Sequence, residues 1–289
     1  MKFRFIGDHR SRFSVEEMCR VLKVSRSGYY ARRNRGKSPL AKENEKLLCE
    51  IRRIHIESRG RYGSPRIYEE LKSHGFSCSR PRVARLMRFH GIRSRITKKY
   101  KVTTKSKHKH PVSPNLLADG YAAKGGNEIW VSDITYVWTR EGWLYLAAIL
   151  DVFNRQIVGW SLSESLKKEL VLHAIHRAMG HRQPKGSLIF HSDRGSQYAS
   201  DAVRKLLNNS EFKQSMSGKG NCFDNAVMES FFHTLKTELV YLEDYWTRDQ
   251  ARKSIFEYIE VFYNRQRIHS SLGYLSPVEF ERRWLPKVA

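Results

Sequence analysis

Residues 127–163, NEIWVSDITYVWTREGWLYLAAILDVFNRQIVGWSLS, contain three consecutive runs rich in β-branched and aromatic residues. Short polar interruptions at Glu141-Gly142 and Asn154-Arg155 separate the runs, as turns separate neighbouring strands. We therefore predict three consecutive antiparallel strands in this stretch.

The chain after residue 163 extends this pattern with alternating elements. Their expected ranges are 165–180 (helix), 187–193 (strand), 199–208 (helix), 212–216 (strand), 223–242 (helix) and 247–263 (helix). Three antiparallel strands followed by helix, strand, helix, strand and helix is the order of the ribonuclease H-like fold. We therefore predict an α/β catalytic domain over residues 127–289, ending in helices.

Charge divides the chain unevenly. Residues 1–115 hold 31 Lys and Arg against 9 Asp and Glu, whereas residues 116–289 hold 22 against 20. A concentrated positive charge favours a polyanionic partner, since each phosphate contact releases condensed counterions. Composition alone does not distinguish DNA from RNA, nor either of them from a surface that is basic only for solubility.

Residues 1–38 contain a short segment with helix-turn-helix spacing. Two helices are expected within 13–36, with a turn at Val24-Ser25 and Ser25 as the N-cap of the second helix. That second helix carries Arg26 and Arg32, which we predict to contact DNA. A plain helical hairpin is the alternative.

Residues 39–96 repeat this arrangement with three helices, and we predict a helix-turn-helix DNA-binding domain. In the third helix Arg82, Arg85 and Arg88 are three residues apart and share one face, beside an apolar side of Val83, Leu86 and Met87. Such a helix suits the major groove; a solvated charged face is the alternative. Residues 97–126, rich in Lys, Pro and Gly, are predicted to be a basic linker along the DNA backbone.

Three acids occupy strand ends or helix positions that the predicted fold can bring together. Asp133 lies in the first strand (WVSDITY), Asp193 ends the fourth (HSDRGSQY), and Glu229 lies on the long helix (NCFDNAVMESFF). A gap of 35 residues separates Asp193 from Glu229. Taken alone, Asp133 is equally consistent with a buried acid capped by backbone amides.

These motifs and their spacing resemble the DDE transposases of bacterial insertion elements, whose core is similar to retroviral integrases. The similarity is greatest to the IS-three family, in particular its second-frame (OrfB-type) catalytic subunit. It extends through YNRQRIHSSLGYLSPVEF at 263–280 and back to about residue 40. The resemblance implies a catalytic triad of Asp133, Asp193 and Glu229, and a DNA contact by Lys236, seven residues after Glu229.

The chemistry of DNA cleavage and strand transfer accounts for three carboxylates. Two divalent ions about 3.5–4 Å apart stabilise charge on the attacking and leaving oxygens of a phosphodiester. Mg²⁺, or Mn²⁺ in its place, prefers hard oxygen ligands, so carboxylates suit it better than His or Cys. We expect Asp133, Asp193 and Glu229 to be the metal ligands, and no nucleotide cofactor is needed because joining conserves bonds.

Other acids and one histidine near these motifs have competing interpretations. Asp151 precedes the turn at 153–155 and is expected to anchor it. Asp224 with Asn225 suits a helix cap before Glu229 better than a metal ligand. His233, one turn after Glu229, is either near a phosphate or simply on the surface.

We expect the partners to be double-stranded DNA at the element's terminal inverted repeats and at the target, with a homo-oligomer in a synaptic complex. The family resemblance adds a subunit or fusion from an upstream reading frame. The sequence shows no membrane segment or signal peptide, so we expect a cytoplasmic, nucleoid-associated bacterial protein. The alternatives are a catalytically inactive DNA-binding regulator of transposition and a nuclease acting on RNA hybrids.

Overall fold

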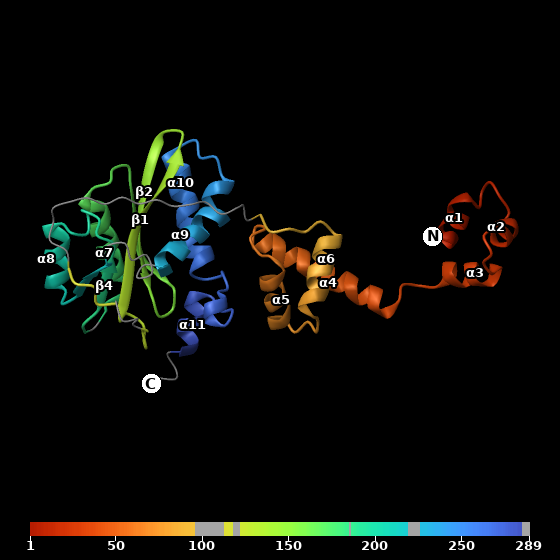
Figure 1. Cartoon of the computed structure of the whole chain (residues 1–289), viewed down its shortest axis with the longest axis horizontal. Helices are drawn as coiled ribbons and strands as arrows, with labels where there is room; N and C mark the ends of the chain where they lie inside the picture. The colour runs from red at the N-terminus through yellow and green to blue at the C-terminus, as the bar shows by residue number, and fades with distance from the viewer. Residues whose placement is uncertain (96–112, 118–121, 185, 219–225, 285–289) are drawn as a thin grey trace. The chain divides into compact units, whose positions relative to one another are not determined.

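The computed structural model of the chain describes residues 1–95, 113–117, 122–184, 186–218 and 226–284. It divides into two compact units, Met1–Ser94 and Arg95–Ala289. The first unit is helical and the second contains the sheet (Figure 1). Within the described ranges, no helix has both the length and the apolar character needed to cross a membrane.

The first unit begins with three short helices, α1 (Lys2–His9), α2 (Val15–Val21) and α3 (Arg26–Asn34). The predicted pair is therefore present, and α1 precedes it. Ser25 caps α3 as predicted, since its hydroxyl accepts a hydrogen bond from the Gly28 amide at 3.0 Å. Four residues from the three helices form a small core: Ile6, Met18, Cys19 and Tyr29.

Three further helices follow, α4 (Pro39–Glu57), α5 (Ser64–Ser73) and α6 (Arg80–Phe89). Their apolar faces meet through Ile51, Ile67, Leu71 and Val83, all fully buried. Gly63 is the N-cap of α5, and Ser64 is the first residue of the helix.

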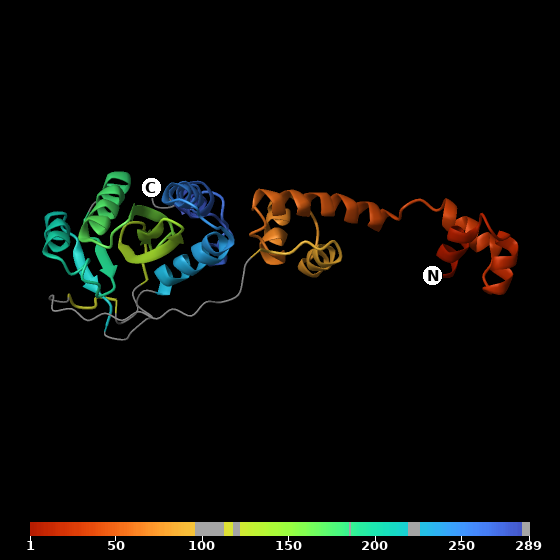
Figure 2. The ribbon, with the colours of Figure 1, turned by 90° about the horizontal axis from the view of Figure 1, so that it is seen from above.

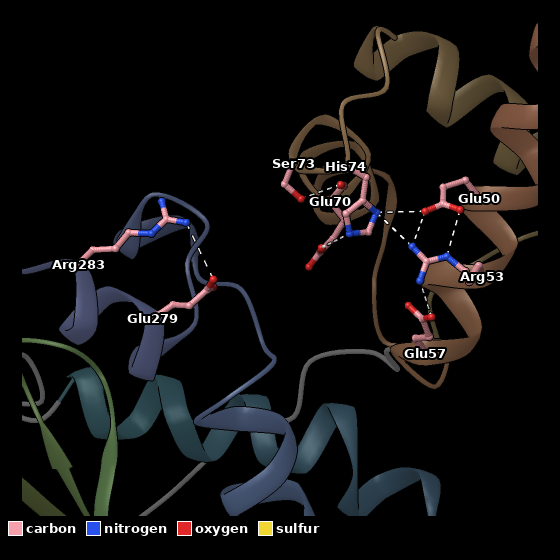
Figure 3. A network of polar contacts seen from close by, with 8 residues as sticks. All are labelled: Glu50, Arg53, Glu57, Glu70, Ser73, His74, Glu279 and Arg283. Carbon is pink, nitrogen blue, oxygen red and sulfur yellow. Dashed lines mark hydrogen bonds and ion pairs between the residues drawn. The ribbon is translucent and has the colours of Figure 1, made fainter.

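Charged side chains join α4 to the end of α5 (Figure 3). Arg53 donates to Glu57 at 2.6 Å and to Glu50 at 3.0 Å. His74, which follows α5, lies 3.1 Å from the Glu50 carboxylate through its Nδ1. Glu50 and Glu57 are thus paired inside the unit, both with Arg53 and Glu50 also with His74.

The second unit is built on a five-stranded sheet with the order β3-β2-β1-β4-β5. β1 (Ile129–Thr139), β2 (Gly142–Asp151) and β3 (Ile157–Ser163) are antiparallel, whereas β4 (Ile189–Ser192) and β5 (Lys213–Met216) run parallel to β1. The three predicted strands and the two later ones are all present. This order confirms the ribonuclease H-like α/β fold.

Helices cover both faces of the sheet (Figures 1 and 2). α7 (Lys168–Arg182) and α8 (Asp201–Asn209) pack on one face around Trp130, Phe190 and Tyr198. α9 (Ala226–Glu238) and α10 (Arg248–Phe256) lie on the other. Burial on both faces accounts for the apolar run at 144–150 in β2, whereas Tyr136 and Trp138 near the end of β1 remain exposed.

The C-terminal helices differ in detail from the sequence prediction. α9 stops at Glu238, and a separate 3-10 turn, η2 (Val240–Leu242), follows it. α10 continues as a π-helix, η3 (Glu257–Tyr263), instead of remaining regular to residue 263. The chain then passes through the 3-10 turn η4 (Ser270–Leu272) and ends in α11 (Pro277–Trp284).

Most of the predicted linker, 96–112 and 118–121, lies outside the described residues. The described part at 113–117 is attached to the catalytic unit. The Leu116 amide donates to the Ser215 hydroxyl at 2.9 Å, and the Met216 amide donates to the Pro114 carbonyl at 3.3 Å, both on β5. This segment therefore covers the outer strand of the sheet.

Candidate active site

Asp133 and Asp193 occupy matching positions on neighbouring parallel strands. The pairing of β1 with β4 ends at Ser132 opposite Ser192, and each aspartate is the next residue of its chain. The carboxyl ends of parallel strands lie at one edge of a sheet, so two distant parts of the sequence deliver acids to the same edge.

Glu229 reaches this region from the helix that packs against β1. It lies in the first turn of α9, where its side chain is exposed, and α9 contacts β1. Lys236 lies two turns later and is half-buried. Its ammonium is 4.8 Å from the centre of the Tyr136 ring on β1.

The electrostatics show that these groups act on one another. Burial, then the negative charge of Asp193 and, more weakly, that of Glu229 raise the pKa of Asp133 to about 7. A hydrogen bond of 2.7 Å from the Ile134 amide and the charge of Lys236 act in the opposite direction. The site therefore gathers more negative charge than its own cations offset.

The surrounding residues fix both strand ends. The Ser132 hydroxyl donates to the Ala148 carbonyl at 3.0 Å and lies 2.8 Å from the buried Tyr198 hydroxyl. Burial, together with the charges of Asp133 and Asp193, raises the pKa of Tyr198 well above its usual value. Tyr198 thus stays neutral and serves as a packed hydrogen-bonding support beneath the acids.

Gly195 shows why the HSDRG motif has glycine after the aspartate. Its amide donates to Asp193 Oδ1 at 2.9 Å, which fixes that carboxylate. A β-carbon at position 195 would lie 2.9 Å from the same oxygen, closer than such contacts allow. A side chain at position 195 would therefore displace the Asp193 carboxylate from this position.

The chemical type of these side chains suits a divalent cation. The donors are hard carboxylate oxygens, and a cation would relieve the charge that raises the pKa of Asp133. In the described part of the chain, however, no three His, Cys, Asp or Glu side chains are grouped closely enough to hold a metal ion. The fold thus brings two acids to one edge with Glu229 nearby, but does not draw the three into a closed ligand set.

The competing acid Asp151 has a different environment. It is fully buried and accepts hydrogen bonds from the Asn127 and Phe153 amides at 2.7 and 3.0 Å, and Arg182 lies 3.7 Å away. This is the anchoring role expected from the sequence. The other competitor, Asp224, lies outside the described residues.

A cavity of about 770 Å³ lies away from these acids, at the outer edge of β3. Basic and aromatic side chains line it: Trp160, His173, His176, Arg177, Arg252 and Phe256. With no carboxylate among its lining residues, it lacks the donors that a hard cation needs.

Comparison with known proteins places this geometry in a family. Integrase core domain models match residues 123–222 and 229–285, and a model of an HTH-like domain matches 42–100. The chain is 45% identical over 267 residues to an uncharacterized 31 kDa protein of insertion element IS600 from Shigella sonnei, covering 92% of this chain and 98% of that protein. It is 39% identical over 285 residues to transposase InsF of insertion sequence IS3A from Escherichia coli (strain K12), covering 98% and 99%.

The chain belongs to the IS-three (IS3) family of transposases. Among solved structures it is similar to the intasome of simian T-cell lymphotropic virus in complex with the PP2A regulatory subunit B56 gamma. That likeness has 14% identity and a TM-score of 0.48, and covers 80% of this chain and 74% of the other. The protein is thus a DNA-binding transposase with an integrase core, and the match of its HTH-like region agrees with the helices described above.

The three arginines of α6 that are predicted to contact DNA differ in their exposure and in their hydrogen-bond partners. Arg82 is turned toward α4, where it donates to Asn44 at 2.8 Å and to Glu43 at 2.7 Å, and its side chain is only 17% exposed. Arg82 thus has intramolecular partners on α4, and its contact with DNA stays a prediction. Arg85 and Arg88 are exposed and have no hydrogen-bond or ion-pair partner in the described ranges.

The two arginines of α3 are both on the surface. Arg26 lies 3.4 Å from Glu16 in an exposed ion pair, and Arg32 stacks over the Phe3 ring at 5.8 Å. Exposed pairs of this kind are weak, so both side chains remain available to a phosphate.

A buried network that the sequence did not predict lies at the C-terminal end of α9. Glu238 accepts hydrogen bonds from Arg267 Nη2 and Nε at 2.8 and 2.9 Å and from the Tyr258 hydroxyl at 2.9 Å. Glu238 and Arg267 are both almost fully buried. The network joins the helix that carries Glu229 to η3 and to the YNRQRIHSSLGYLSP segment, which explains the polar residues of that motif.

Proposed function

We propose that this transposase cleaves and joins DNA at the ends of its insertion element with Asp133, Asp193 and Glu229 as catalytic residues. The observation that carries the proposal is the paired position of Asp133 and Asp193 at one sheet edge, with Glu229 acting electrostatically on the same site. Carboxylates that repel one another around a raised pKa are typical of a cation-binding catalytic site.

The three carboxylates would hold two Mg²⁺ or Mn²⁺ ions. Bound divalent ions supply charge neutralisation at the phosphodiester and activation of the attacking oxygen. The protein's own part is positional: Ser132, Tyr198 and Gly195 hold the two strand ends, and α9 presents Glu229 and Lys236 toward β1. Water attacks the phosphodiester at the element's end, which breaks its P–O3′ bond and releases a 3′-OH. That hydroxyl then attacks a second phosphodiester, forms a new P–O bond and displaces the 3′ oxygen of the attacked strand.

Basic side chains would hold the DNA. In this proposal Arg82, Arg85 and Arg88 on α6 read a groove, Arg26 and Arg32 on α3 contact phosphates, and Lys236 contacts the element's end near the acids. The proposed organisation is a short helix-turn-helix segment at 1–38, a DNA-binding domain at 39–96, a linker at 97–126 and the catalytic core at 127–289. The chain would act as a homo-oligomer on paired ends, in the cytoplasm at the nucleoid, with or without an upstream-frame subunit.

The test is joining of oligonucleotides that carry the element's ends, with Mg²⁺ or Mn²⁺ and the full chain. Asp193→Asn is expected to lower joining by at least about a thousandfold, since one carboxylate of a cooperating set is lost. Asp201→Asn, an exposed acid at the start of α8, is the matched control and should retain activity. Wild-type joining by Asp193→Asn would overturn the assignment, and DNA binding without any metal-dependent nicking by the native chain would favour the inactive regulator.

A further inference from the structure

Three large aromatic side chains form a strip on one face of the hairpin that carries Asp133. Tyr136 and Trp138 on β1 alternate with buried Val137, and Trp143 on β2 is directly opposite Trp138. The Trp143 ring centre is 5.1 Å from that of Tyr136 and 4.8 Å from that of Trp138. We call Tyr136, Trp138 and Trp143 the aromatic strip.

Hairpin stability explains the contacts inside this strip but not its outer surface. Cross-strand aromatic pairs do support a hairpin. Yet the three residues remain 51%, 56% and 43% exposed, whereas Val137 and Leu144 on the opposite face are fully buried. A contiguous exposed aromatic surface of this size is typical of a binding site.

Position connects the strip to the candidate active site. Tyr136 follows Asp133 by three residues, about 10 Å along a strand, so the two side chains leave opposite faces of the sheet, and the strip is connected to the acids around the edge of β1. The pairing between β1 and β4 stops at Ser132, so that β4 does not cover the edge of β1 next to these residues. Lys236 comes from α9 at this edge, with its ammonium 4.8 Å from the Tyr136 ring.

The aromatic rings and the nearby Lys and Arg side chains indicate which class of ligand binds the aromatic strip. Trp246, 60% exposed, lies beside the turn of the same hairpin, with the Arg140 guanidinium, which also pairs with Asp244, 3.6 Å above its ring. Aromatic faces beside Lys and Arg bind unpaired nucleotides, whose bases stack on the rings while the phosphates meet the cations. Intact duplex hides its base faces, so the strip matches DNA strands that are locally opened.

We propose that the aromatic strip stacks unpaired bases of the DNA strand whose phosphodiester is held at Asp133 and Asp193. This inference rests on the proposed function, because it uses the acid site to place the DNA. It assigns the strip to nucleotides within a few positions of the reacting phosphate, since successive nucleotides of one strand are about 3.4 Å apart.

The test is photocrosslinking of the full chain to a single-stranded oligothymidylate that contains one 5-iododeoxyuridine, in EDTA. The crosslinked peptide is then identified by mass spectrometry. We expect crosslinks to peptides containing Tyr136, Trp138 or Trp143, and a loss of about tenfold in Trp138→Ala/Trp143→Ala. Trp138→Phe, which keeps a ring, should retain most of the yield, and so should Phe256→Ala, an exposed aromatic residue elsewhere in the unit.

Two results would overturn the inference. One is crosslinking confined to other peptides, including the one with Phe256, or unchanged by the double variant. The other is a double variant that shifts sedimentation of the DNA-free protein to a smaller species, which would make the strip a contact between copies of the chain. Asp193→Asn should crosslink normally in EDTA, so a failure of the catalytic proposal leaves this readout intact.

Discussion

Two carboxylates in the catalytic unit, the buried Glu238 and the partly buried Asp133, have opposite surroundings. Glu238 receives two hydrogen bonds from Arg267 and one from Tyr258. Asp133 receives one amide hydrogen bond and the partial help of Lys236, while Asp193 and Glu229 repel it. The first acid is fully compensated by the protein itself, and the second is not.

This difference separates a structural acid from a candidate functional one. A buried charge costs free energy unless it is paired and hydrogen-bonded. Glu238 meets that condition and joins α9 to η3. Asp133 does not meet that condition, so the protein does not compensate its charge. We assign this uncompensated charge to binding a cation during DNA cleavage and joining.

The largest effect is expected from Glu238→Gln. The change leaves the Arg267 guanidinium buried without its counter-charge, and loss of one partner of a buried pair costs about 3–5 kcal/mol of unfolding free energy. Urea unfolding followed by tryptophan fluorescence measures it, since all six tryptophans lie between residues 130 and 284. Glu243→Gln, at an exposed position nearby, should change stability by less than about 0.5 kcal/mol. If Glu238→Gln lowered the unfolding free energy by less than about 1 kcal/mol, the claim that Glu238 and Arg267 compensate each other would be contradicted.

The same chemical change at Asp133 should have the opposite sign. Because the folded-state pKa is raised to about 7, the folded protein binds a proton more tightly than the unfolded chain, and stability falls as the pH rises toward 7. Asp133→Asn removes this loss in metal-free protein. Its stability relative to the native chain should therefore increase by about 2 kcal/mol between about pH 5 and about pH 8. A difference that does not vary with pH would show that Asp133 is compensated after all.

A smaller effect is expected from Lys236→Met. The positive charge of Lys236 lowers the pKa of Asp133, although burial and the other acids outweigh it. Without this cation the folded-state pKa of Asp133 should rise by less than about one unit. The pH range over which the folded protein loses stability should then extend upward by the same amount. The pH dependence of unfolding in EDTA measures the shift. A downward movement would mean that Lys236 does not face Asp133.

Much of the catalytic fold could be predicted from local sequence. The runs at 128–138, 143–153 and 155–163 are long and rich in strand-forming residues, so they became β1, β2 and β3. The pairing of Asp133 with Asp193 followed from the expected strand order. Arg85 and Arg88 lie on the surface because their helix buries the apolar side that the spacing predicts.

The features that were missed depend on contacts between distant residues. Nothing near Glu238 indicates that Arg267 lies 2.8 Å away, 29 positions later. Arg82 shares a helix face with Arg85 and Arg88, yet it donates hydrogen bonds to Glu43 and Asn44 on α4, 39 and 38 positions earlier in the chain. The aromatic strip could not be predicted for a related reason: alternation predicts two faces of a strand, but which face is exposed depends on how distant segments pack against the sheet.

The most direct measurement is the stabilisation of the catalytic unit by Mn²⁺ or Mg²⁺ near pH 7.5, followed by tryptophan fluorescence during urea unfolding. The account predicts a saturable gain in the native chain, about 2.7 kcal/mol at a hundred times the dissociation constant. The gain should be lost in Asp133→Asn/Asp193→Asn and kept in Glu243→Gln. Equal stabilisation of the native chain and the double variant would contradict the claim that these two aspartates bind the cation.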